Sequence, residues 1–112
     1  MSLALVGPVG IRRELLEKTC QEAVGHTHNY DHTTIVIRGR LQITYHQLQT
    51  DGTWAVSKVE EASQGSAVFI AATVRHTLKA LDDNTQYMCV FSHRDFDGLV
   101  TQIYVGNAKA YD

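Results

Sequence analysis

The sequence has little of several residue types on which other protein classes depend. It contains one proline, Pro8, so no later segment is kept out of the interior of a β-sheet. Its two cysteines, Cys20 and Cys89, lie too far apart for the CxxC spacing of zinc or thiol-redox sites. Ten Lys and Arg oppose twelve Asp and Glu, and the formal net charge of −2 gives no general attraction for nucleic acid or an anionic membrane. No apolar run approaches the roughly 20 residues of a membrane span.

The length of 112 residues suits a single domain, residues 1–112, with one hydrophobic core. Residues 1–10 include a short apolar stretch, but they lack the basic start and the long apolar segment of a secretory signal. We therefore expect a cytoplasmic protein with reduced, structural thiols and with no nucleic-acid or membrane partner.

Most of the chain consists of short β-type runs separated by turns. Residues 41–48 alternate apolar and polar side chains, which is the pattern of a half-buried strand. Asp51-Gly52 then predicts a hairpin turn, with residues 53–59 as the returning strand. Further strand-like runs cover residues 66–72, 75–81, 86–93 and 99–106, with turns or loops at 82–85 and 94–98. Many short strands at close spacing predict an all-β sandwich or small barrel.

Two features of this pattern stay open at the level of the sequence. Residues 11–23 fit a short helix and an edge strand equally well. In residues 86–93 either of two sets points inward, and both are mostly apolar. The sets are Tyr87, Cys89 and Phe91, and Met88, Val90 and Ser92.

Three of the six histidines, His26, His28 and His32, fall within seven residues. Residues two apart on an extended segment point to the same side, so His26 and His28 can reach one metal ion. The turn-prone residues before His32 can bring the chain back to the same point. The alternative is a polar loop in which the histidines are turn residues.

His76 is the candidate for a fourth ligand. Arg75, Thr77 and Lys79 share one face of the predicted strand at 75–81, so His76 lies on the opposite face with Leu78 and Ala80. An isolated inward histidine is usually a hydrogen-bonded core residue, but here it accompanies a histidine cluster. His46 falls on the polar face of its strand, where we expect solvent exposure, and His93 at a strand end predicts a surface loop residue.

Residues 25–39 resemble the first sequence motif of the cupins, which has a Gly, an HxH pair, an acidic residue and a closing Gly. His32 stands at the acidic position and Gly39 at the closing one. Residues 65–80 resemble the second motif, with Gly65 first and His76 at the ligand position. The chain departs from that motif where Ala71, Thr73 and Ala80 replace its Pro, Gly and Asn.

The resemblance implies a single-domain cupin-type jelly roll, a β-barrel or sandwich with a short N-terminal extension and a metal in its interior. It further implies the four-histidine type, with His26, His28, His32 and His76 as ligands. Manganese or iron is favoured for such a site, but imidazole also suits nickel, zinc and copper. Four neutral ligands leave the full +2 charge on the ion. A purely structural zinc site remains the alternative to catalysis.

Within that frame we expect a dioxygenase-type oxidoreductase that acts on a small, rather apolar or aromatic substrate. A non-catalytic binding or sensor protein and a metal-assisted isomerase or lyase are the alternatives. The lyase needs a base, for which the sequence offers only Tyr30, Asp31 and His93. The sequence assigns no catalytic residue and no organic cofactor. Apolar Ile35 and Ile37 on the second face of their strand, and residues 1–20 as an exchangeable strand, favour a homodimer by analogy with cupins.

Overall fold

The computed structural model describes residues 2–26, 31–72 and 74–92, with only the backbone described at 24–26. Within these residues the chain forms nine strands. They are β1 (Ser2–Val6), β2 (Val9–Leu16), β3 (Glu22–His26), β4 (His32–Arg38), β5 (Arg40–Leu48), β6 (Trp54–Ser63), β7 (Ala67–Ile70), β8 (Arg75–Ala80) and β9 (Thr85–Ser92). The described part contains no helix long and apolar enough to cross a membrane.

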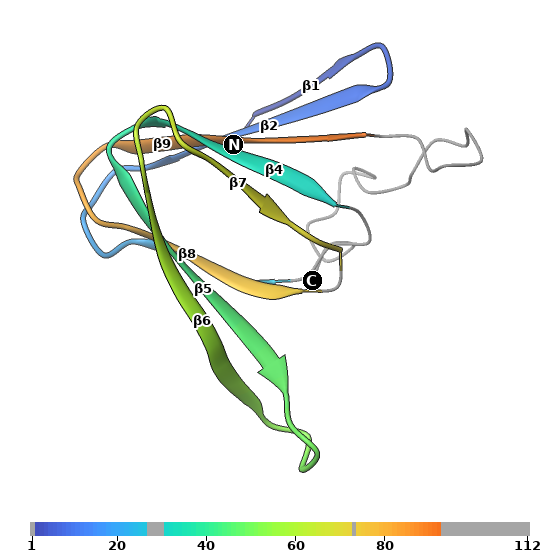
Figure 1. The fold of residues 1–112 in the computed structure, drawn as a ribbon. Coiled ribbons are helices and arrows are strands. Elements are labelled where there is room, and N and C mark those ends of the chain that lie inside the picture. The colour runs from blue at the N-terminus through green and yellow to red at the C-terminus, as the bar shows by residue number, and fades with distance from the viewer. Residues whose placement is uncertain (1, 27–30, 73, 93–112) are drawn as a thin grey trace.

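The strands form two antiparallel sheets that face each other (Figure 1). The first has the order β1-β2-β9-β4-β7 and the second the order β3-β8-β5-β6. The β5–β6 hairpin extends beyond the rest of its sheet, as the lower part of Figure 1 shows. The predicted all-β fold is confirmed, and the strands are arranged as two sheets.

The core lies between the two sheets and follows from the alternation of side chains along the strands. In β5, Leu41 and Ile43 are completely buried, as the pattern in residues 41–48 predicts. Opposite them in β8 lie Ala80 and Leu78, which are equally buried. The first sheet supplies the other half of the core, mainly Leu16, Val36, Ile70, Tyr87 and Cys89.

The two glycine turns at the ends of β5 have different surroundings. Gly52, in the predicted hairpin, has φ of 85°, and a side chain added there would meet no atom within 4 Å. Gly39 joins β4 to β5 with φ of 77°, and it lies directly against Thr85. Both positions use a backbone conformation that glycine adopts without steric cost.

The structure resolves the two alternatives that the sequence leaves open. Residues 9–16 form a strand rather than a helix, and β2 lies between β1 and β9 instead of at the edge. In β9 the buried set is Tyr87, Cys89 and Phe91. The expected loop at 94–98 and strand at 99–106 lie outside the described residues.

Candidate metal centre and the adjoining cavity

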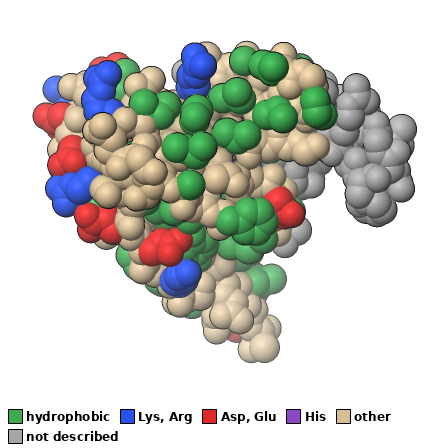
Figure 2. Space-filling view, turned by 45° about the horizontal axis from the view of Figure 1, so that its top comes forward, with side chains coloured by type: hydrophobic (Ala, Val, Ile, Leu, Met, Phe, Trp, Pro, Cys, Tyr) green, Lys and Arg blue, Asp and Glu red, His purple; other side chains and the backbone are tan. Residues whose placement is uncertain are grey.

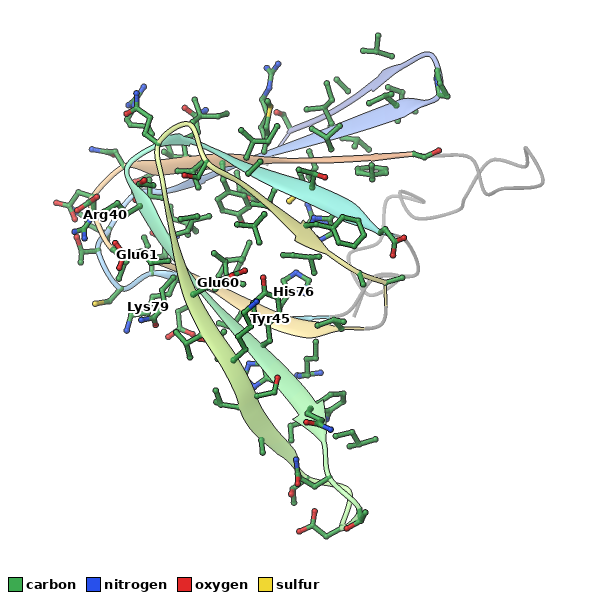
Figure 3. The ribbon with its side chains drawn as sticks, in the orientation of Figure 1. Arg40, Tyr45, Glu60, Glu61, His76 and Lys79 are labelled. Carbon is green, nitrogen blue, oxygen red and sulfur yellow. The ribbon has the colours of Figure 1, made fainter. Side chains whose placement is uncertain are left out.

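His32 and His76 approach each other from the two facing sheets. His32 begins β4 and His76 is the second residue of β8, and their side chains are 2% and 0% exposed. Their ring centroids lie 5.4 Å apart with an interplanar angle of 53°. Figure 3 shows His76 in the space between the sheets. Its predicted inward orientation is therefore confirmed, although the two residues are 44 positions apart in the sequence.

The hydrogen bonds of these two rings suit metal ligation. The Nδ1 of His76 lies 2.9 Å from the carbonyl oxygen of Val74, and because a carbonyl only accepts, Nδ1 carries the proton. The lone pair of the neutral ring is then on Nε2, which is buried. Metal-binding histidines are commonly oriented in this way by a bond from the other ring nitrogen.

His32 is positioned by a neighbour on its own strand. Its Nδ1 lies 3.1 Å from the hydroxyl oxygen of Thr34, which in turn lies 3.4 Å from the Sγ of Cys89. All three side chains are buried. Burial raises the pKa of the Cys89 thiol, so Cys89 is a protonated core residue at neutral pH, in agreement with the structural role expected for it.

The other two predicted ligands are described only in part. The backbone of His26 pairs with that of His76 across β3 and β8, but its side chain lies outside the described residues, as does the whole of His28. In the described part of the chain, no three His, Cys, Asp or Glu side chains form a group that could hold a metal. The structure thus brings His32 and His76 together and places the start of the cluster beside them.

Of the remaining sequence candidates, His46 lies away from this pair, Asp31 directly precedes His32, and Tyr30 and His93 belong to the residues that the structure does not describe. His46 is on the outer face of β5, where its Nε2 lies 3.2 Å from the hydroxyl of Thr77. This contact makes His46 half-buried rather than fully exposed, but it keeps the ring on the expected face. Asp31 is exposed, and its carboxylate accepts a hydrogen bond of 2.6 Å from the Ala72 amide. Tyr30 and His93 lie outside the described residues.

One cavity reaches His32 of the histidine pair, and a second is lined by Tyr45 and Val74, which are neighbours of His76 in the ladder and in the chain. A cavity of about 480 Å³ includes His32 and Asp31 in its wall, and one of about 340 Å³ includes Tyr45 and Glu60. Phe69 lines both cavities and is 63% exposed. The second cavity also has Ser57, Lys58, Ala71 and Val74 in its wall.

Tyr45 and Glu60 are candidate functional residues that the sequence did not indicate. Tyr45 is directly opposite His76 in the β5–β8 ladder, and directly opposite residues of an antiparallel pair share a face. The Tyr45 hydroxyl donates a hydrogen bond to the Glu60 carboxylate, which also pairs with Lys58 at 3.3 Å. Burial and the hydrogen bond to Glu60 raise the pKa of Tyr45, whereas the hydrogen bond from Tyr45 lowers the pKa of Glu60. The pair is therefore a phenol and an ionised carboxylate. Figure 3 labels both residues on the neighbouring strands β5 and β6.

Comparison with known proteins identifies the fold. No protein-family model and no curated protein matches the sequence. Among solved structures, the chain is similar to oxalate decarboxylase from Bacillus subtilis, a protein with Mn(II) centres, with a TM-score of 0.61 and 16% identity. It is also similar to Lactobacillus farciminis oxalate decarboxylase, solved as a formate complex, with a TM-score of 0.60 and 21% identity, and to a Neisseria meningitidis protein, with a TM-score of 0.63 and 11% identity.

The coverage differs among these structures. The three matches include 76%, 75% and 81% of this chain. They include 21% and 23% of the two oxalate decarboxylases but 80% of the Neisseria protein. The chain therefore spans less than a quarter of each decarboxylase. The two antiparallel sheets and these likenesses define a cupin-type jelly roll, and the predicted fold class is confirmed.

Proposed function

We propose that this cupin-type domain binds one divalent transition metal through His26, His28, His32 and His76. The observation that carries the proposal is the approach of the buried His32 and His76 rings, 5.4 Å apart, from opposite sheets. The Val74 carbonyl leaves the lone pair of His76 on the buried Nε2, which fits a metal ligand. The Mn(II) centres of the similar Bacillus enzyme support manganese or iron as the ion.

We further propose that the site performs dioxygenase-type oxidation of a small organic substrate. A bound manganese or iron ion would supply redox chemistry and open coordination positions. The protein supplies an apolar wall, including Phe69, Ala71 and Val74, against which the apolar part of the substrate can pack. Tyr45, beside His76, provides a hydroxyl group that is held in place by Glu60.

A metal-assisted lyase is a second candidate, and a specific observation favours it. Lyase chemistry needs a positioned group to move a proton, and the ionised Glu60 carboxylate lies in the cavity wall with the Tyr45 hydroxyl. The similarity to oxalate decarboxylases supports the same alternative. The third candidate is a binding or sensor role without turnover, and an experiment has to distinguish it from the two enzymatic functions.

The test is metal analysis by mass spectrometry and electron paramagnetic resonance on protein purified without chelators, followed by an oxygen-uptake screen. We expect about one manganese or iron per chain with exchangeable water, and substrate-dependent oxygen consumption. Turnover without oxygen uptake would favour the lyase. Tightly held zinc without exchangeable water would contradict both enzymatic proposals and favour a structural or binding role.

We also propose that the protein forms a homodimer through the outer face of the five-stranded sheet. Hydrophobic side chains gather over this face in Figure 2, and Leu15 and Ile37 on it are 44% and 37% exposed. Large exposed apolar patches are rare on monomeric proteins, and where they occur they commonly mark interaction sites.

Leu15→Lys and Ile37→Lys are each expected to convert the dimer to a monomer, because a stable interface of roughly 1,000 Å² does not tolerate an unpaired charge buried within it. Analytical ultracentrifugation measures the change. Val59→Lys is the control, since Val59 is also exposed but lies on the second sheet. A wild-type monomer, or loss of the dimer only in the Val59 variant, would contradict this interface.

A further inference from the structure

The smaller cavity contains a polar cluster made of Tyr45, Lys58 and Glu60. Tyr45 pairs with Lys58 and Ile43 pairs with Glu60 in the β5–β6 ladder, so all three polar side chains belong to the face that carries the core. One carboxylate oxygen of Glu60 accepts the Tyr45 hydroxyl, and the other lies 3.3 Å from the Lys58 amine. The Tyr45 hydroxyl therefore donates its proton within the cluster, while its oxygen can still accept a hydrogen bond from a ligand.

The charges of this cluster discriminate between ligands. Glu60 and Lys58 cancel in formal charge, but the Glu60 side chain is 30% exposed and that of Lys58 is 64% exposed. The carboxylate is thus the more buried charge, and solvent screens it less than it screens the Lys58 ammonium group. A ligand carboxylate would meet like charge there, whereas a hydroxyl group can donate to Glu60 or Tyr45 and accept from Lys58.

The rest of the cavity wall is apolar. Phe69, Ala71 and Val74 line it, and the exposed ring of Phe69 offers a flat surface where the two cavities adjoin. Aromatic rings pack favourably against such a surface. The volume of about 340 Å³ is at the small end of ligand cavities, which suits a molecule with one ring.

We infer that this cavity binds a neutral aromatic molecule with a hydroxyl group, a phenol, and that Glu60 excludes aromatic carboxylates of similar size. The inference rests on the proposed function in one respect, because it takes the cavity beside His76 as the substrate pocket. It needs no bound metal, since the polar cluster and the apolar wall belong to the protein alone.

The experiment compares phenol and benzoate by isothermal titration calorimetry at pH 7, with the protein as purified and after chelator treatment. Phenol is expected to bind with a Kd on the order of 1 mM, as a ligand with few atoms does. Benzoate is expected to bind about tenfold more weakly, because of the Glu60 charge. In Glu60→Gln, the amide oxygen still accepts the Tyr45 hydroxyl but the charge is absent, so the preference for phenol should fall below about threefold.

Glu61→Gln is the matched control. Glu61 is the adjacent residue on the opposite face of β6, where its carboxylate pairs with Arg40 at 3.3 Å. The preference for phenol should persist in this variant. Lys58→Met is an independent variant at an exposed position. Because it removes the cation, it should raise the ratio of the benzoate Kd to the phenol Kd by about threefold.

Equal binding of phenol and benzoate to the wild-type chain, or an unchanged preference in Glu60→Gln, would overturn the inference. Metal content is measured on the same samples so that the two proposals can fail separately. A metal-loaded protein with no preference for phenol would refute the inference alone. A chelator-treated protein that prefers phenol but takes up no metal on reconstitution would refute the proposed metal function alone.

Discussion

Alanine in place of His76 is expected to lower the affinity for Mn(II) by at least about a hundredfold, because even residues that only orient a ligand change affinity by 10- to 100-fold. His76 is completely buried and its ring faces His32 from the opposite sheet. Without the imidazole, the proposed site loses the ligand from β8. Metal per chain after dialysis and an electron paramagnetic resonance titration measure the loss, and circular dichroism confirms that the β-sheets remain.

His46→Ala is the matched control for this experiment. His46 lies on β5, the neighbour of β8, but its ring is on the outer face and contacts Thr77. Its removal should leave Mn(II) affinity unchanged within about twofold, since the ring lies on the face opposite the proposed site. Full metal retention by the His76 variant, or a loss caused by the His46 variant, would place the metal elsewhere.

Alanine in place of Gly39 is expected to lower the free energy of unfolding by about 3 kcal/mol, the sum of backbone strain and steric overlap. Gly39 has φ of 77°, and an added Cβ would lie 2.5 Å from the Oγ1 and 3.1 Å from the Cα of Thr85. Thr85 is completely buried, and its hydroxyl donates a 2.8 Å hydrogen bond to the Asp82 carbonyl. It therefore has little freedom to move aside, and urea denaturation measures the cost.

Gly52→Ala separates the two contributions. Gly52 has a similar φ of 85°, but an added Cβ would meet nothing within 4 Å. Its substitution should therefore cost only the backbone strain, about 1 kcal/mol. If the two variants lose the same free energy, the contact with Thr85 contributes nothing to the role of Gly39.

The sequence predicts the local features of this fold well. Period-two alternation identifies β5, and the same reasoning in residues 75–81 orients His76 toward the core because Leu78 and Ala80 share its face. Both predictions depend only on residues within one strand. The same reasoning could not distinguish a helix from a strand in residues 11–23, because the charged and apolar side chains there fit both periodicities. The pairing of β2 with β1 and β9 determines that residues 11–16 form a strand.

The polar cluster in the smaller cavity could not be predicted in this way. In the sequence, Tyr45 follows the apolar alternation of Leu41 and Ile43, which predicts only a core residue. Glu60 lies just past the predicted strand at residues 53–59. Their contact depends on the register between β5 and β6, including the irregularity between Tyr45 and His46. Register is set by turns and by packing against the other sheet, so a single strand does not contain that information.

The position of β9 has a consequence for how the protein folds. It lies between β2 and β4, so the first sheet joins residues 9–16 and 32–38 only through residues 85–92. Contacts between segments so distant in the sequence form slowly, whereas the β5–β6 hairpin is local and can form early. During synthesis, the sheet that carries His32 is therefore completed only after residue 92 has left the ribosome, and metal loading at the proposed site should follow the emergence of β9 rather than that of β4.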